Sequence, residues 1–136
     1  MNREIKFRGK SYFDGRWIFG DLFHTIGTTG DGLAIQYYDE EDGWMTEDIK
    51  DRTVGQFTGM YYEGKEIYEG DIIHCAIGHS PNIYEITGVV EYRICAFVLH
   101  YKRYNQDAYI WLDALIGADV IGNIHDNPKL LEGGQQ

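Results

Sequence analysis

The side chains best suited to metal binding are histidines and cysteines in the second half of the chain. Zinc accepts mixed imidazole and thiolate ligands, and the candidates are His74, Cys75, His79, Cys95 and His100. Their spacing contains no Cys-x-x-Cys or His-x-x-x-His pair, and adjacent residues of a strand point to opposite faces of a sheet. The sequence therefore predicts no metal site and no cofactor.

The sequence offers few candidate nucleophiles for catalysis. Ser11 and Ser80 are the only serines, and neither lies in a nucleophile-elbow pattern. Cys75 and Cys95 fall within predicted strands and are expected to be buried, whereas a reactive thiol is accessible and lies beside cationic groups. A disulfide between them is the alternative, but nothing indicates an oxidising compartment, so we expect free thiols. Glycine-rich phosphate loops are also absent from the sequence, and we predict that the protein is not an enzyme.

An acidic segment surrounds one tryptophan. Its carboxylates are Asp39, Glu40, Glu41, Asp42, Glu47, Asp48 and Asp51. Clustered carboxylates can bind calcium, but the regular ligand spacing of an EF-hand is missing, which favours a solvated hairpin tip. Trp44 lies inside this segment, and an aromatic residue flanked by charge is a candidate interface anchor. The alternative is that Trp44 folds back onto the sheet.

Cations and aromatic rings alternate in two later segments. These are Tyr92-Arg93 and Tyr101-Lys102-Arg103-Tyr104. On neighbouring strands they would form a stacking platform for single-stranded nucleic acid, or else simply a solvent-facing strand end. The formal net charge of -10 weighs against a polyanionic partner, so nucleic acid is an unlikely partner.

The composition indicates short β-strands joined by tight turns. The chain of 136 residues has 17 glycines, 11 tyrosines and only two prolines, and glycine supplies the positive φ of hairpin turns. Strands are predicted at residues 4–9, 16–19, 33–38, 53–57, 71–77, 84–93, 95–101, 108–111 and 119–124. Gly88 predicts a bulge or bend, residues 112–116 predict a short helical turn, and Asn127-Pro128 should stop the last strand. Gly27 to Gly32 is expected to be a flexible tip.

The chain nearly repeats itself at an offset of fifty residues. Phe7, Gly9, Tyr12, Gly20, Asp21, Leu22 and His24 reappear as Phe57, Gly59, Tyr62, Gly70, Asp71, Ile72 and His74. A closing phrase, Thr53 to Phe57, resembles Val120 to Ile124. Such a repeat is an architectural signal, and a structural role explains both histidines without catalysis. An enzyme would need a pocket that gathers Asp21, His24, Asp71 and His74 from the two copies.

The predicted fold is therefore mainly β. Two related SH3-like or curled antiparallel units, at about residues 4–57 and 57–126, are expected to fuse into one compact body of residues 1–136, with a tail at 127–136. Glycine and its neighbours are expected to shape the turns and to pack closely. The residues of this turn motif are Gly15, Gly20, Asp21, Gly55, Gly59, Gly64, Gly70, Asp71, Gly122 and Asn123.

Four segments resemble the YopX family of bacteriophage and prophage proteins. In order they are Arg3 to Arg8, Thr53 to Gly59, Gly64 to Ile73 and Val120 to Pro128. The resemblance spans nearly the whole chain and implies an accessory phage protein without an established activity, together with self-assembly into a homo-oligomer. The family motif supplies no catalytic residues.

These observations predict a binding protein. No apolar run approaches the ~20 residues of a membrane span, and the N-terminus lacks the pattern of an export signal, so we expect a soluble protein in the cytoplasm of a bacterial host. The leading hypothesis is a non-enzymatic phage or prophage protein that binds another protein or itself through aromatic sheet faces. The alternatives are a nucleic-acid binder that uses Arg93, Lys102 and Arg103, and an acidic DNA mimic that inhibits a host protein.

Overall fold

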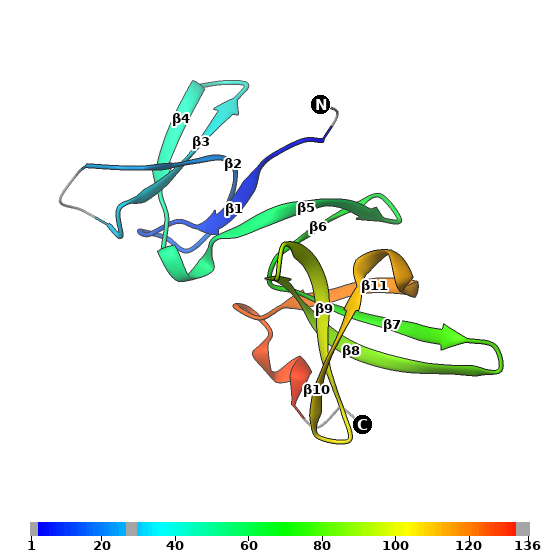
Figure 1. Cartoon of the computed structure of the whole chain (residues 1–136). Coiled ribbons are helices and arrows are strands. Elements are labelled where there is room, and N and C mark those ends of the chain that lie inside the picture. Colours follow the sequence, from blue (N-terminus) through cyan, green and yellow to red (C-terminus); the bar gives the residue numbers. More distant parts are fainter. Residues whose placement is uncertain (1–2, 27–29, 133–136) are drawn as a thin grey trace. The chain divides into compact units, whose positions relative to one another are not determined.

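The structure, a computed structural model, describes residues 3–26 and 30–132 (Figure 1). The chain divides into two compact units, unit 1 at Met1–Gly59 and unit 2 at Met60–Gln136, and each is described by itself. Part of the predicted flexible tip, residues 27–29, and the end of the predicted tail, residues 133–136, lie outside the described residues.

Unit 1 is built around a meander of four antiparallel strands. Its elements are β1 (Phe7–Lys10), β2 (Trp17–His24), β3 (Leu33–Asp39), β4 (Gly43–Asp48), the 3₁₀ turn η1 (Asp51–Thr53) and β5 (Gly55–Tyr62). After η1 the chain returns, and β5 pairs with β1. The sheet order is β4-β3-β2-β1-β5, followed by β6 (Lys65–Tyr68). Ile18, Ile35 and Ile49 form the buried core, against which Phe7 and Leu22 pack.

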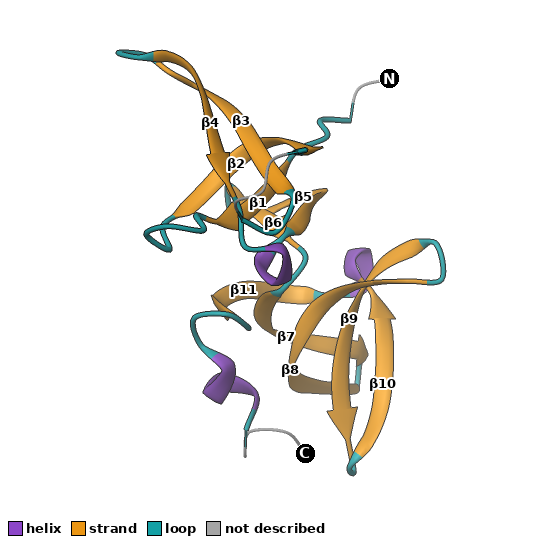
Figure 2. Ribbon diagram, turned by 90° about the vertical axis from the view of Figure 1, so that its left-hand side faces the viewer, coloured by secondary structure: helices purple, strands orange, loops and turns teal. Residues whose placement is uncertain are grey.

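Unit 2 contains longer strands and a larger core. Its elements after β6 are β7 (Asp71–His79), β8 (Asn82–Arg93), β9 (Ala96–Arg103), β10 (Gln106–Trp111), the 3₁₀ turn η2 (Leu112–Ala114), β11 (Ile116–Asn123) and η3 (Pro128–Leu131). The sheet order is β10-β9-β8-β7-β11, and Figure 2 shows the long hairpin of β9 and β10. The buried core consists of Ile67, Ile73, Cys75, Ile77, Ile86, Val90, Leu99, Tyr101, Leu112 and Ala118.

The two sheets share one strand order. Each has a four-stranded meander, a 3₁₀ turn and then a strand that pairs with the first strand of the meander, and the first sheet also carries β6 beside β5. The predicted class, mainly β with curled antiparallel strands, is confirmed. Neither sheet closes into a barrel in the part of the chain that the structure describes.

The fifty-residue repeat does not match this shared order. Gly20-Asp21 lies in the middle of β2, the second strand of its meander, whereas Gly70-Asp71 leads into β7, the first strand of the other. The closing phrase fits better, because Thr53 to Phe57 leads into β5 and Val120 to Ile124 lies largely in β11, and both strands return to the first strand of a meander. Duplication of one ancestral unit stays a prediction.

Several local predictions were wrong. β4 and β6 were not expected as strands. The pairing of β8 with β7 and β9 continues unbroken through Gly88, so no bulge lies there. An added Cβ at Gly88 would lie 2.5 Å from the carbonyl oxygen of His100, so glycine permits a close approach of β9 instead. The irregular pairing lies in β11, between Ile116 and Asp119 and between Val120 and Gly122.

The end of unit 2 follows its sequence signals more closely. The short helical turn predicted at 112–116 is η2, and β11 ends at Asn123, before the asparagine and proline that were expected to stop it. Pro128 begins η3, where its missing amide proton removes no helical hydrogen bond. Among the described residues, the helical segments are too short and too polar to cross a membrane.

Candidate binding face

Strands β8, β9 and β10 of unit 2 present one continuous face of alternating residues. Because side chains alternate along a strand, the register places on the same side Val89, Glu91 and Arg93 of β8, Val98, His100 and Lys102 of β9, and Asp107, Tyr109 and Trp111 of β10. We call these nine residues the β8–β10 face.

His100 lies at the centre of this face between two carboxylates. Its Nδ1 is 2.8 Å from Glu91 Oε2, and its Nε2 is 2.9 Å from Asp107 Oδ1. The imidazole stacks on the Tyr109 ring, with the centroids 4.7 Å apart. When both ring nitrogens carry protons, both donate to carboxylates, so the arrangement favours the charged imidazolium.

The pKa values of these three groups reflect that geometry. Burial lowers the pKa of His100, but the hydrogen bonds with Glu91 and Asp107 outweigh burial and leave it raised. Burial raises the pKa of Glu91, but hydrogen bonds from His100 and Arg93 outweigh that effect and lower it. The hydrogen bond with His100, followed by the charge of Lys102, lowers the pKa of Asp107. The network thus joins three strands through charged hydrogen bonds.

Arg93 is held in a fixed orientation beside this network. Its Nε donates to Glu91 Oε1 at 2.6 Å, and the centre of its guanidinium lies 4.7 Å from the centroid of the Tyr109 ring. The two terminal nitrogens have no hydrogen-bond partner among residues 3–26 and 30–132. A guanidinium that is anchored at Nε and stacked on a ring can present these nitrogens to a carboxylate or phosphate as a planar pair.

A hollow of about 370 Å³ lies at this end of the face. Its lining is mostly apolar and aromatic and consists of Arg93, Ile94, Val98, Tyr109, Ile110 and Trp111. The residues at its rim are exposed, Trp111 to 62% and Ile94 to 96%. Mainly apolar walls with one oriented cation are typical of a binding site, and the lining contains no nucleophile.

Backbone strain occurs at the rim of the hollow. Ile94 and Cys95 form the turn between β8 and β9 with φ of 48° and 67°. For a β-branched residue such as isoleucine, positive φ is an outlier that costs about 1–3 kcal/mol. The chain therefore keeps an exposed isoleucine at the hollow in spite of its conformational cost.

The platform predicted from alternating cations and aromatics is divided between two faces. Arg93 and Lys102 lie on the β8–β10 face, whereas Tyr92, Tyr101 and Arg103 lie on its reverse. Tyr101 is buried in the core. A single stacking platform was therefore the wrong interpretation, because neighbours in a strand point to opposite sides.

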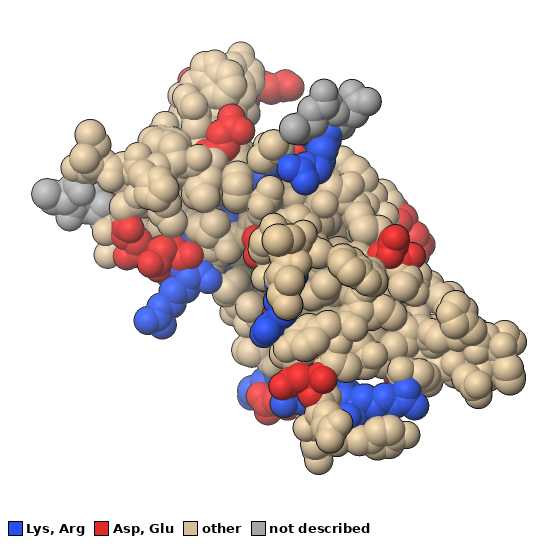
Figure 3. All heavy atoms as spheres, viewed as in Figure 1, with Lys and Arg blue, Asp and Glu red and all other residues tan. Residues whose placement is uncertain are grey.

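The remaining members of that predicted platform are engaged locally. The Arg103 guanidinium lies 3.5 Å from the Tyr84 ring centroid, and Tyr104 occupies the β9–β10 turn with φ of 54°. Lys102 Nζ is 3.5 Å from Asp107 Oδ1. Figure 3 shows basic and acidic side chains interleaved in the lower part of the view, where β9 and β10 lie in Figure 1.

Sequence reasoning missed the residues that make this face. Glu91, His100, Asp107, Tyr109 and Trp111 were not identified as one cluster. The available signal was the alternation of Asp107, Tyr109 and Trp111, which places all three on one side of a strand. Only pairing with β9 could show that His100 lies beside them.

The predicted turn residues include true turns. Gly15, Gly64 and Gly70 lie in turns or loops with φ of 77°, 81° and 91°. Gly59 also has a positive φ, 89°, but lies within β5. Asp71 Oδ2 accepts a hydrogen bond from the Tyr68 amide at 2.7 Å, as expected for an aspartate that follows a turn glycine. Asn123 Oδ1 likewise accepts from the amides of His125 and Asp126.

Other members of the predicted turn motif are strand residues. Gly20 and Asp21 lie within β2 and Gly55 begins β5, so a turn was the wrong interpretation for these three. An added Cβ at Gly20 would lie 2.2 Å from the Gln36 carbonyl oxygen, and one at Gly122 would lie 2.5 Å from Asn127 Oδ1. Gly20 and Gly122 are therefore packing positions.

The residues considered as metal ligands have separate surroundings. His74 contacts Thr87 Oγ1 and Glu85 Oε1, each at 2.9 Å, while Cys75 is buried and burial raises its pKa to about 11. His79 ends β7. Cys95 was expected to be buried in a strand but is exposed in a turn. Both cysteines are free thiols, and no group of three metal-ligating side chains occurs in the described segments.

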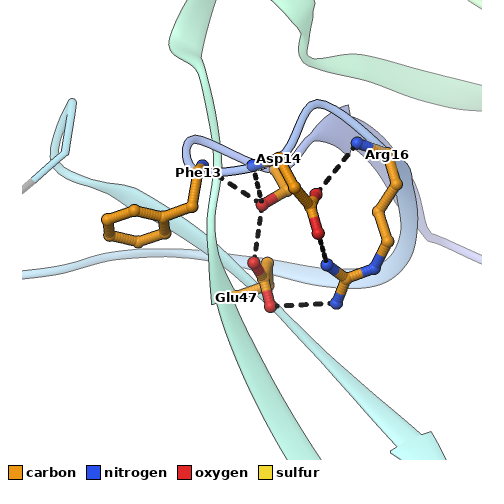
Figure 4. A network of polar contacts seen from close by, with 5 residues as sticks. Phe13, Asp14, Arg16 and Glu47 are labelled. Atoms are coloured by element: carbon orange, nitrogen blue, oxygen red, sulfur yellow. Dashed lines mark hydrogen bonds and ion pairs between the residues drawn. The ribbon is translucent and has the colours of Figure 1, made fainter.

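Unit 1 contains a polar network that clamps its first hairpin to β4 (Figure 4). Ser11 is fully buried and donates to Glu47 Oε2 at 2.6 Å. Arg16 bonds Asp14 and also reaches Glu47 Oε1 at 3.2 Å. The serine hydroxyl accepts from the amide of Phe13. No histidine takes part in these contacts of the described residues, so the network is a structural clamp and not a nucleophile with its base.

Only the first four carboxylates of the acidic segment, Asp39 to Asp42, lie at a hairpin tip, because Glu47 and Asp48 belong to β4 and Asp51 to η1. Trp44 is 66% exposed and pairs across the hairpin with Tyr38, with ring centroids 5.4 Å apart in an edge-to-face arrangement. Asp39 Oδ1 accepts from the amides of Glu41 and Asp42 at 2.8 and 3.0 Å. Trp44 therefore does not fold back into the core, and its ring lies against that of Tyr38.

Comparison with solved structures shows a related fold. The crystal structure of protein EF1440 from Enterococcus faecalis matches with a TM-score of 0.54 and 20% identity, over 96% of this chain and 100% of that chain. At this identity the likeness concerns the fold alone. Among curated proteins, none matches this chain.

The sequence itself matches one family model. The model, described as YopX protein, covers residues 6–132. This range includes both units and the β8–β10 face, and it agrees with the resemblance of the four sequence segments. The chain belongs to the YopX family.

Proposed function

We propose that this chain is a non-enzymatic phage or prophage accessory protein that works by binding proteins, with the β8–β10 face as its binding surface. The observation that carries the proposal is the hollow of about 370 Å³, where exposed Trp111 and oriented Arg93 lie together. Trp, Tyr and Arg are the side chains most enriched at interface hot spots. Its expected setting is the cytoplasm of a bacterial host, and self-association is one form of this binding.

The chemistry of the face supports binding rather than catalysis. His100 shares both ring nitrogens with carboxylates, so neither nitrogen is available as a base without breaking the network. Trp111 presents a large apolar surface with one polar N–H, which suits an interface that is partly wet.

Affinity capture from a bacterial host lysate tests the proposal. Trp111→Ala should reduce recovery of the partner by about tenfold or more, because truncated hot-spot residues commonly cost 2 kcal/mol or more. Phe13→Ala is the matched control, since Phe13 is 69% exposed in unit 1 and distant in sequence from the face. Circular dichroism should show unchanged folding of both variants. Equal recovery by Trp111→Ala and the wild type would contradict the assignment of this face.

Nucleic-acid binding is the weaker alternative. The ion pairs of Arg93 with Glu91 and of Lys102 with Asp107 reduce the positive charge of the face. The triple variant Arg93→Ala, Lys102→Ala, Arg103→Ala would abolish any salt-sensitive binding that depends on these cations. Unchanged binding in that variant excludes this mode.

A further inference from the structure

We propose that the hollow of the β8–β10 face receives the acidic hairpin tip of a second copy of this chain. The tip comprises residues 38–44 at the β3–β4 turn, with Trp44 as the inserted side chain. The inference rests on the proposed function of the face and names its partner.

The hairpin tip has the form of a preorganised ligand. The Tyr38–Trp44 ring contact and the two hydrogen bonds that Asp39 accepts from backbone amides hold the shape of the tip. Ordering before association reduces the conformational entropy lost on binding. Both rings are largely exposed, Tyr38 to 60% and Trp44 to 66%, so the tip can bury aromatic surface only against another surface.

The hollow offers matching apolar contacts. Trp111, Ile94 and Val98 line it, and an indole buries roughly 150–250 Å² when it is enclosed. The volume of about 370 Å³ lies within the range of sites that hold compact ligands. Trp44 is therefore of a suitable kind and size to fill the hollow.

The charges of the tip and of the hollow favour this contact. The tip carries four consecutive carboxylates, Asp39 to Asp42. The β8–β10 face carries two cations, Arg93 and Lys102, against two anions, Glu91 and Asp107, for a formal net charge of zero. The terminal nitrogens of Arg93 lie at the hollow and suit a carboxylate. The acidic tip therefore meets a less acidic surface than the chain's net charge of -10 would provide.

The proposed contact joins two different surfaces. A contact between the tip of one copy and the hollow of the next is heterologous, so it generates a closed ring or an open chain of copies. Each copy then offers one unused tip and one unused hollow until the assembly closes. This asymmetry permits a complementation test.

The test uses two variants that disable opposite halves of the contact. Trp44→Ala removes the inserted ring and keeps the hollow. The double variant Arg93→Glu, Trp111→Ala damages the hollow and keeps the tip. Sedimentation velocity across the micromolar range should show association of the wild type, with dissociation constants raised by about thirtyfold in each variant alone, the effect of losing a hot spot.

Mixing the two variants should restore one contact. The intact tip of the double variant then binds the intact hollow of Trp44→Ala, and the mixture should give a 1:1 heterodimer and no larger species. Higher salt should weaken this heterodimer, since screening reduces the attraction between exposed charges. Phe13→Ala serves as the control and should associate like the wild type.

Three results would overturn the inference: a wild type that stays monomeric, a Trp44→Ala variant that associates like the wild type, or a mixture that forms no heterodimer. Lysate capture separates this failure from failure of the proposed function. The wild type could stay monomeric and still capture a partner that Trp111→Ala loses. That result would support the β8–β10 face as a binding surface and show that another protein occupies it.

Discussion

Units 1 and 2 build the same strand order around different interiors. In unit 2, ten buried residues form the core, whereas three buried isoleucines form that of unit 1. Unit 1 supplements its small core with the Ser11–Glu47–Arg16 network. The same strand order can therefore be stabilised in two ways. Apolar packing dominates in unit 2, whereas a polar hydrogen-bond network supplements a small apolar core in unit 1.

The use of charge also differs between the units. In unit 1, the hydrogen bond from the Arg16 amide is the main cause that lowers the pKa of Asp14. In unit 2, His100 joins two carboxylates and has a raised pKa. The charged hydrogen bonds of His100 should thus weaken as pH rises through its raised pKa, whereas those of Asp14 should weaken as pH falls through its lowered pKa.

The largest expected effect comes from the core of unit 2. Leu99→Ala should lower the free energy of unfolding by about 3–5 kcal/mol, because a cavity forms among many buried neighbours. Ile49→Ala in unit 1 should cost about 2 kcal/mol, at the low end of such changes, because a small core relaxes more easily. Urea denaturation monitored by circular dichroism measures both. Equal losses would show that the two interiors do not differ in the way described, and Ile83→Ala, at a half-exposed position, is the control.

An intermediate effect is expected from the polar clamp of unit 1. Ser11→Ala should cost about 1–3 kcal/mol, because Glu47 loses its buried donor and the Phe13 amide loses its acceptor. The midpoint of urea unfolding provides the measurement. Thr46→Ala, on the exposed side of β4, is the control. A Ser11→Ala variant as stable as the control would mean that the small apolar core suffices for unit 1.

The smallest effect concerns pH and His100. A histidine with a raised pKa in the folded state contributes stability that is fully present below its ordinary value of 6.5 and is lost as pH rises through the raised value. Glu91 and Asp107 have lowered pKa values, so their contributions are lost as pH falls below their ordinary values of 4.5 and 3.8. The network should therefore stabilise unit 2 most between these limits.

His100→Gln tests that expectation. The difference in melting temperature between wild type and variant should be greatest near pH 6 and should shrink at alkaline pH, with a free-energy change under about 1 kcal/mol for partly exposed ion pairs. Ser11→Ala should show no such change above neutral pH. A difference for His100→Gln that is constant from pH 6 to alkaline pH would contradict the role of its charge.

The sequence predicted the class of the fold because glycine turns and β-branched alternation are local signals. It identified strands near β3, β7, β8 and β9, whose apolar residues alternate or form runs. It missed β4, because Glu47 and Asp48 within this strand read as part of an acidic loop. Glu47 and Asp48 have little strand propensity of their own, and hydrogen-bonded pairing with β3 stabilises the strand.

The β8–β10 face was less predictable. Arg93 and Lys102 were identified, but they were grouped with Tyr101 and Arg103, which point to the other side of the sheet. Strand register determines which residues meet, and a shift of one residue exchanges the faces. The contacts of His100 join three strands, so they could not be read from a single segment.

The strained turn at Ile94 has a consequence for engineering. Asparagine followed by glycine is favoured in a two-residue turn with positive φ, so the double substitution Ile94→Asn, Cys95→Gly should raise the free energy of unfolding. The same exchange would remove the aliphatic Ile94 side chain from the lining of the hollow and the exposed Cys95 thiol from the adjoining turn. If the hollow binds a partner as proposed, this turn would set thermal stability against binding.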